Sequence, residues 1–212
     1  PEAFKGSFAE DLVVELSSAS HPYSALTFPA LAKPLNLPVP QPELFFVPDD
    51  PALSYYRPLF ANNVCMLEER HAAPDGGDTK ATAKMFAKML DENDHLPDQK
   101  MVLKARLLDI LTGDFDRHFD QWRWGTEDTG KGKIYYPIPR DRDQAFFYSD
   151  GAVLKAVSGR AMPFLKGLRS TIPKVNWLGY SARDFDRLFL TDLDEGEWGK
   201  ITADFKESIS DS

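Results

Sequence analysis

The chain has 212 residues, of which 42% are hydrophobic and 12% aromatic, so it is long enough to bury a full core as one large domain or two small lobes. Its 25 basic and 33 acidic residues give a net charge of -8, which argues against general binding to nucleic-acid backbones or anionic membranes. Any anionic ligand therefore needs a local basic site or a bridging cation. No apolar run approaches the roughly 20 residues of a membrane-spanning helix, so we expect no membrane insertion by this segment.

A single cysteine, Cys65, lies in an apolar run and cannot form an internal disulfide, so the sequence assigns no redox compartment. The chain begins at Pro1 without a methionine. We therefore interpret it as a fragment of a longer protein.

The first part of the chain is predicted to mix helices and strands. Apolar positions at helical spacing predict a helix from about Phe8 to Ser18, and a second, proline-punctuated helix from Tyr23 to Leu35. The prolines at 38–42 end that helix. Two short strands rich in aromatic or apolar residues follow, at Glu43–Val47 and Asn63–Glu69.

The pattern changes after the loop at 73–78, which is rich in glycine and aspartate. Thr79–Asn93 and Asp98–Leu111 each carry apolar residues on one face with strong helix formers between them, and both are predicted to be helices. The remaining predicted elements are a strand and two helices, at Lys133–Ile138, Ala182–Leu190 and Trp198–Ser208.

These elements predict an α+β fold with a boundary near residue 74. Residues 1–73 would form a small mixed lobe, and residues 74–212 a mostly helical lobe.

Two acidic clusters, at residues 114–122 and 139–146, lie beside apolar sequence. A folded core tolerates so many carboxylates only when they are paired, hydrated or bound to a metal. Phosphoryl transfer needs a carboxylate that orients the attacking hydroxyl and oxygen ligands that hold a divalent cation. Asp116 and the amide of Gln121 supply one of each.

The second cluster contributes two further carboxylates. Asp141 and Asp143 stand two apart after an extended segment, so we expect them to point the same way, toward one cation.

Structural roles are considered for the neighbours of these residues. The alternative for the first cluster is a solvated turn after a helix. His118 is interpreted as bonding the loop backbone in preference to acting as a general base, and Arg117 as orienting carboxylates in preference to clamping a phosphate. Trp122 and Trp124 are interpreted as core anchors that hold the loop.

The two clusters resemble known kinase motifs. The segment Asp116-Arg117-His118-Phe119-Asp120-Gln121-Trp122 is similar to the catalytic loop shared by HipA-type kinases, type II phosphatidylinositol kinases and secreted Fam20-like kinases. The segment Asp141-Arg142-Asp143-Gln144-Ala145-Phe146 resembles the metal loop of the spore-coat CotH kinases. The longer stretch Leu108–Phe147 resembles a kinase-like segment of large bacterial surface proteins, often from Bacteroidetes, that are named as surface antigens or phosphoesterases.

The resemblance implies a two-lobed protein-kinase-like fold, mostly the helical C-terminal lobe with a partial N-terminal lobe. It further implies transfer of a phosphoryl group from ATP to an unidentified acceptor with Mg²⁺ or Mn²⁺, and an extracytoplasmic or cell-envelope location within a larger bacterial protein. Gln121 stands where the motif has asparagine; it is one methylene longer, so its oxygen reaches a cation only if the loop is displaced. The resemblance assigns catalysis to Asp116, Arg117 and His118, and metal binding to Gln121, Asp141 and Asp143.

Nucleotide contacts are expected upstream. Residues 64–69 would form the hinge strand, with Met66 and Glu68 at the nucleotide, and Glu15 would be the helix glutamate that pairs with a phosphate-binding lysine. No glycine-rich hairpin followed by a strand lysine is recognisable before that helix. Either those elements precede Pro1 in a longer parent, or the fold has no kinase activity.

Two other functions stay open. One is a non-catalytic kinase-like module that serves as a scaffold or binding unit of a larger surface protein. The other is a metal-dependent phosphoesterase, which would use the same carboxylates to activate water.

Overall fold

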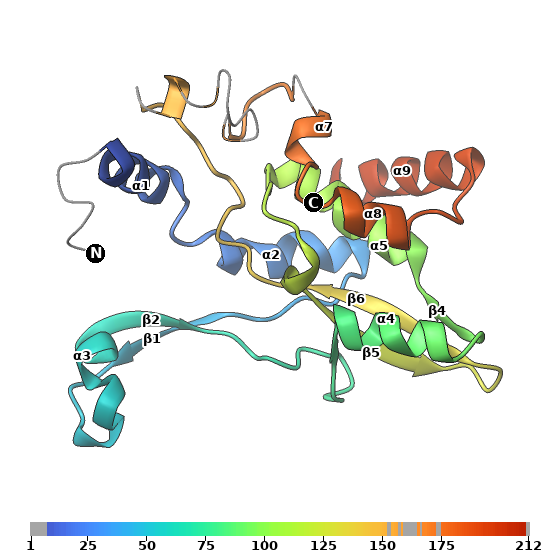
Figure 1. Ribbon diagram of the computed structural model, residues 1–212, viewed down its shortest axis with the longest axis horizontal. Coiled ribbons are helices and arrows are strands. Elements are labelled where there is room, and N and C mark those ends of the chain that lie inside the picture. The colour runs from blue at the N-terminus through green and yellow to red at the C-terminus, as the bar shows by residue number, and fades with distance from the viewer. Residues whose placement is uncertain are drawn as a thin grey trace.

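The computed structural model describes residues 8–151, 154–156, 158, 165, 167–172 and 175–210. These residues form both helices and strands, which confirms the mixed α+β class (Figure 1). None of the described helices has the length and apolar character of a membrane-spanning segment.

The two helices predicted near the N-terminus are present. α1 (Phe8–Ala19) is followed by α2 (Ser24–Ala32), which contains Pro29 and continues into the 3-10 turn η2 (Lys33–Leu35). Asn36 adopts a left-handed backbone with φ 54° and ends the turn.

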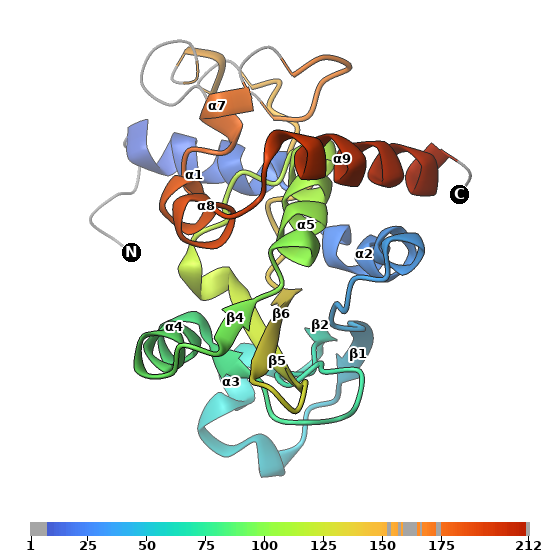
Figure 2. The ribbon, with the colours of Figure 1, turned by 90° about the vertical axis from the view of Figure 1, so that its right-hand side faces the viewer.

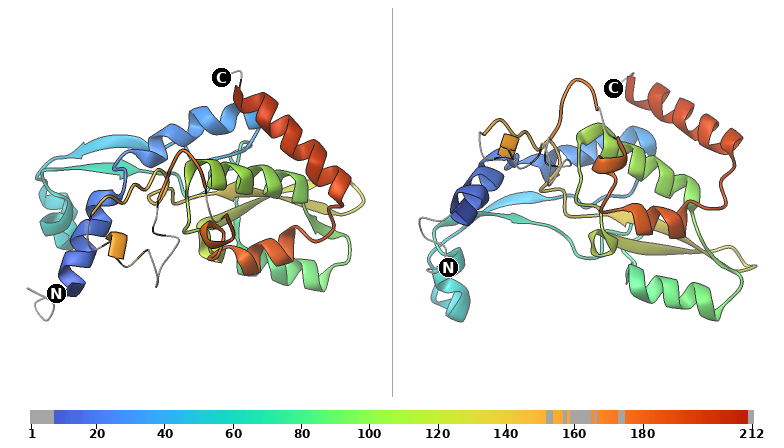
Figure 3. Two further views of the ribbon diagram at one scale, coloured as in Figure 1. Left: turned by 90° about the horizontal axis from the view of Figure 1, so that it is seen from above. Right: turned by 45° about the horizontal axis from the view of Figure 1, so that its top comes forward.

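A two-stranded arm follows. β1 (Glu43–Val47) pairs antiparallel with β2 (Asn63–Leu67), and the tip carries η3 (Pro51–Tyr56) and α3 (Arg57–Phe60), so both predicted strands are confirmed. Figures 1 and 3 show this unit reaching away from the other elements. We call residues 43–67 the apolar arm, because its exposed side chains include Leu44, Phe45, Phe46, Tyr55, Tyr56, Leu59, Phe60, Val64, Met66 and Leu67.

A four-stranded sheet has the order β3-β5-β6-β4. Its centre is the antiparallel hairpin of β5 (Trp122–Asp128) and β6 (Lys133–Pro139). The short β4 (His95–Pro97) joins β6 in parallel, and β3 (Lys80–Ala81) joins β5.

Of the four strands in this sheet, only β6 was predicted from the sequence. β5 follows directly after the first acidic cluster, and its glycine-containing end is typical of a loop. In the hairpin Gly125 faces Tyr136, and a side chain at position 125 would lie 2.0 Å from the tyrosine ring. The glycine is therefore a packing requirement across two strands.

Five helices complete the described structure. α4 (Thr82–Asp91) starts three residues later than predicted, because β3 pairs with β5 just before it. α5 (Gln99–Thr112) begins at the cap Asp98, whose side chain accepts a hydrogen bond from Met101 N, and ends at Gly113 with φ 67°. The last three are α7 (Val175–Leu178), α8 (Arg183–Phe189) and α9 (Glu195–Ser210).

The main core is formed by residues of α2, α4, α5, α8, α9 and the sheet, elements whose arrangement is shown in Figure 2. Trp122 and Trp124 are 1% and 0% exposed, which confirms their interpretation as core anchors. The Trp122 ring stacks on Phe185 of α8 with centroids 4.4 Å apart, and Trp124 lies 4.9 Å from Phe189. The first strand of the hairpin is thereby fixed against α8.

Candidate functional site

The β5-β6 hairpin brings the two acidic clusters together. One cluster precedes β5 and the other follows β6, so antiparallel pairing places them side by side. The backbone confirms the closure, because Arg140 N donates to Gln121 O at 2.9 Å. Residues twenty positions apart in sequence therefore share one end of the hairpin.

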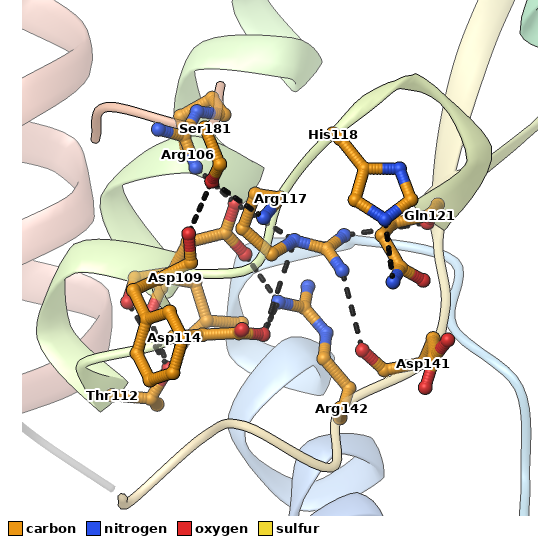
Figure 4. A network of polar contacts seen from close by, with 12 residues as sticks. Arg106, Asp109, Thr112, Asp114, Arg117, His118, Gln121, Asp141, Arg142 and Ser181 are labelled. Atoms are coloured by element: carbon orange, nitrogen blue, oxygen red, sulfur yellow. Dashed lines mark hydrogen bonds and ion pairs between the residues drawn. The ribbon is translucent and has the colours of Figure 1, made fainter. Parts of the chain in front are cut away.

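A network of buried arginines and aspartates lies beneath these loops (Figure 4). Three arginines face three aspartates, so the formal charges balance, and five of the six residues are at most 4% exposed. We call this set the arginine–aspartate network; its members are Arg106, Asp109, Asp114, Arg117, Arg142 and Asp186.

Asp109, in the last turn of α5, is the centre of the network. Its carboxylate accepts a hydrogen bond from Arg106 Nη1 at 2.6 Å and lies 3.3 Å from Arg117 Nε. Arg142 also donates to it, and donates to Asp114 Oδ2 at 2.9 Å. Such pairs hold a structure together only when every member is in place, since removing one leaves an uncompensated buried charge.

The pKa values of the two central carboxyls shift in opposite directions, although burial raises both. Burial alone would raise the pKa of Asp109, but Arg142, Arg117 and Arg106 together hold it below its usual range. Burial raises the pKa of Asp114 to about 6, and the nearby Asp109 charge adds to the rise, despite the opposing effect of Arg117 and Arg142. Asp109 is therefore the anionic centre of the network, and Asp114 is the member that protonates most readily.

Arg117 joins the two loops from below. Its Nη1 donates to Arg140 O at 2.6 Å and is 3.4 Å from Asp141 O, while Nη2 is 3.4 Å from Gln121 O. The side chain is 1% exposed and packs over the Trp122 ring at 4.7 Å. A guanidinium held in this way orients the loops, in accordance with the first of the two roles considered from the sequence, and does not extend toward solvent.

Three carboxylates lie above the network, on the exposed side. We call Asp116, Asp141 and Asp143 the acidic rim. Arg142 is buried between the two aspartates of the second loop, which are both exposed. Burial raises the pKa of Asp143, and the charges of Asp141 and Asp116 raise it further, so the three side chains are close enough to repel one another.

His118 and Gln121 border the rim. His118 Nδ1 accepts a hydrogen bond from Asp120 N at 3.3 Å, which caps the 3-10 turn η4 (Phe119–Gln121) and matches the structural role expected from the sequence. A neutral imidazole whose Nδ1 accepts carries its proton on Nε2. That atom is 3.8 Å from Asp116 Oδ1 and 3.3 Å from the Gln121 amide. The amide is therefore best oriented with its oxygen toward His118.

The donor set fits a hard divalent cation in its chemistry. The rim offers carboxylate oxygens, and Gln121 offers an amide oxygen, which are the ligands that Mg²⁺ and Mn²⁺ prefer. A cation would also relieve the repulsion that raises the pKa of Asp143. Among the described residues, however, no three acidic, histidine or cysteine side chains are already gathered as metal ligands.

Of the upstream residues, one reaches the second loop. Glu68 Oε1 accepts a hydrogen bond from Arg140 Nε at 2.7 Å, so the end of the apolar arm is tied to the residue before Asp141. Met66 lies within β2, opposite Leu44, and is 38% exposed. Glu15, on α1, accepts from Leu154 N at 2.9 Å, which ties α1 to the segment after the second loop.

The sequence prediction missed the support of this site. Asp109 and Arg106 stand three apart on a helix whose other buried residues are largely apolar, and that pattern could have revealed them. Ser181 carried no signal: its hydroxyl donates to Phe115 O and accepts from Arg117 N at 3.1 Å, bridging the loop to a distant turn.

Comparisons with protein-family models, with curated proteins and with solved structures give no match to this chain.

Proposed function

We propose that this chain is the larger part of a kinase-like phosphotransferase domain, in which Asp116 acts on the acceptor and Asp141 and Asp143 hold Mg²⁺ or Mn²⁺ at the phosphates of ATP. The observation that supports it is the convergence of two sequence-remote loops into one acidic rim with a rigid buried base. The same loops resemble kinase catalytic and metal loops, and this resemblance is the reason for proposing phosphoryl transfer as the reaction.

In this proposal the exposed residues take part in the reaction and the buried ones position them. Asp116 is 41% exposed in its side chain and is free to accept the proton of an acceptor hydroxyl as that oxygen attacks the γ-phosphorus, with ADP as the leaving group. The His118 ring lies 3.8 Å from this carboxylate and caps the turn that follows it. A bound cation supplies neutralisation of the charge on the phosphates.

Arg117 serves this chemistry indirectly. By bonding the carbonyls of Arg140 and Gln121 it sets the distance between the acceptor side and the metal side of the rim. Positioning of this kind contributes most of the catalysis in phosphoryl transfer, because the transition state needs alignment and charge more than covalent chemistry.

The kinase-like proposal gives the apolar arm a place. It would be the part of the nucleotide lobe adjoining the hinge, and Glu68 links it to the metal loop. Strands bearing the glycine-rich turn and the nucleotide lysine, which are not recognisable here, would extend this small sheet and cover its apolar side chains.

The arm equally favours a second candidate, a binding module of a larger surface protein. Phe46, Val64 and Leu67 are each more than 60% exposed, and an apolar surface of this kind marks an interaction site. In that case the acidic rim would be a remnant of the kinase-like fold.

Metal binding separates the two candidates. Thermal unfolding of the wild type is followed while Mn²⁺ or Mg²⁺ is added, and a cation at one hundred times its dissociation constant should stabilise the fold by about 2.7 kcal/mol. Asp141→Asn should abolish the response. The matched control is Asp91→Asn, an exposed aspartate at the end of α4, which should respond as the wild type does.

A second measurement tests the assignment of Asp116. Asp116→Asn should keep most of the metal response, because the proposal gives this residue to the acceptor. If neither cation shifts the unfolding of the wild type, or if Asp141→Asn responds unchanged, the phosphotransferase proposal fails and the binding module is the better description.

A further inference from the structure

A second charged region lies along the edge of β5 that pairs with β3, whereas β6, which leads into the second acidic loop, pairs with the other edge. It is a cavity of about 830 Å³ between the linker that follows the apolar arm, β3, the first turns of α4 and one residue of β5. Five basic side chains and one aspartate, Asp78, line it. We call it the basic pocket; its basic residues are Arg70, Lys80, Lys84, Lys88 and Arg123.

The positive charge of this pocket is not neutralised within the described part of the chain. Arg70, Lys84 and Lys88 form no ion pair there, Lys80 Nζ is 3.3 Å from the Thr126 hydroxyl, and Arg123 donates to Thr79 Oγ1 at 2.9 Å and to the Thr79 carbonyl. The aspartate is fully exposed and lies 3.9 Å from His71. The chain has more acidic than basic residues, yet among the described residues no carboxylate forms an ion pair with these five basic side chains.

The spacing of the lysines concentrates the charge. Lys84 and Lys88 stand one helical turn apart on α4, a spacing at which like charges repel and destabilise a helix. Lys80 precedes them by another four residues and is held in β3. Burial lowers the pKa of Arg123, and the charges of Arg70 and Arg140 lower it further, which places three arginines within electrostatic range of one another.

The ring of His71 completes the pocket. The Thr79 amide donates to His71 Nδ1 at 3.0 Å, so the neutral ring carries its proton on Nε2 as a further donor. The base is firm, because Thr82 at the start of α4 donates to Phe119 O at 2.8 Å and accepts from Trp124 Nε1 at 3.0 Å. The pocket therefore combines donors and cations on a fixed frame.

We propose that the basic pocket binds the phosphate group of a small phosphorylated molecule. Phosphate is the ligand that clustered arginine and lysine donors recognise best, and the volume suits a small molecule more than a polymer. This proposal does not depend on phosphoryl transfer at the acidic rim.

Isothermal calorimetry on the whole chain tests the pocket, with EDTA present so that the acidic rim takes no part. The probes are pyrophosphate and glucose 6-phosphate, with glucose as the uncharged reference. Both phosphates should bind saturably and glucose should not. The double variant Lys84→Gln/Lys88→Gln should weaken both phosphates by about tenfold or more, since two charge-assisted contacts are lost.

The matched control is Lys100→Gln/Lys104→Gln, which removes two lysines at the same spacing on α5, outside the pocket. It should change binding by about twofold or less. Absence of saturable binding by the wild type, or equal weakening in the two double variants, would overturn the proposal, the second result by showing only a diffuse effect of charge. Circular dichroism confirms that both variants are folded.

Discussion

The aspartates of the two acidic loops behave in two opposite ways although they are neighbours in sequence. Asp114 and Asp116 are two residues apart, yet the first is 2% exposed and paired with Arg142, while the second is half-buried, with a side chain 41% exposed, and lies on the acidic rim. In the second loop the inward residue is Arg142, and the aspartates on either side of it face outward.

Each loop therefore contains both buried residues that stabilise the fold and outward residues that could take part in chemistry. The inward residues pair with one another and fix the loops, whereas the charges of Asp141 and Asp116 on the outward side raise the pKa of Asp143. A residue type at a motif position therefore says little until its burial and its partners are known.

Removal of the central inward carboxylate should have the largest effect on stability. Asp109→Asn leaves Arg106, Arg117 and Arg142 without their shared anion, and we expect it to lower the free energy of unfolding by about 3 to 5 kcal/mol. Urea denaturation measures the loss. The outward control Asp116→Asn should change stability by no more than about 0.5 kcal/mol. Similar values for the two variants would show that burial does not divide the loops as described.

The pH dependence of stability should differ between variants of the two inward aspartates, Asp114 and Asp109. Because the folded protein raises the pKa of Asp114 from 3.8 to about 6, it keeps this proton where the unfolded chain has lost it, and stability from this group falls as pH rises from about 4 to 6. Asp114→Asn removes that fall. Its unfolding free energy relative to wild type should therefore rise across this window, by at most about 3 kcal/mol.

Asp109→Asn supplies the opposite control. The pKa of Asp109 is lowered in the folded state, so its contribution is present above about pH 4 and is lost only as pH falls further. The destabilisation of Asp109→Asn relative to wild type should thus be nearly constant between about pH 4 and 7, unlike that of Asp114→Asn. Thermal unfolding between pH 4 and 7 tests both variants, and parallel pH profiles would contradict the assignment.

Arg117→Lys should loosen the joint between the loops without removing charge. A lysine cannot span the carbonyls of Arg140 and Gln121 together, so we expect a loss of about 1 to 3 kcal/mol. Hydrogen exchange at the Arg140 amide, which is bonded to Gln121 O, reports the joint directly and should become faster. The exposed control Arg183→Lys should leave that exchange rate as it is; a rate unchanged in both would argue against a joining role for Arg117.

The smallest effect is expected on the outward side. Asp141→Asn removes one of the charges that repel Asp143, so the fold should be unchanged or more stable by about 0.5 kcal/mol or less. Urea denaturation without metal measures this change, with the exposed Asp91→Asn as the reference. A clear loss of stability in Asp141→Asn alone would mean that Asp141 supports the backbone, whose left-handed φ is 56° at this residue.

Local signals in the sequence determined most of the elements. Helical periodicity located α1, α2, α5, α8 and α9, and apolar runs between turn formers located β1, β2 and β6, with differences of a few residues at their ends. These signals succeed because backbone preferences and amphipathic spacing act over a few residues. Asp141 and Asp143 are both exposed, but Asp141 has a left-handed backbone and not the extended one on which their predicted common direction was based.

Tertiary structure decided what those elements become together. β5 is fixed where Trp122 stacks on Phe185 and Trp124 packs against Phe189, on α8, a helix some sixty residues away, and no local pattern contains that contact. The same holds for Asp109 and for the lysines of the basic pocket, whose roles depend on side chains brought in from other elements. Burial and ion pairing depend on three-dimensional neighbours. The sequence alone could therefore identify the charged residues but not which of them are buried and paired inside the fold.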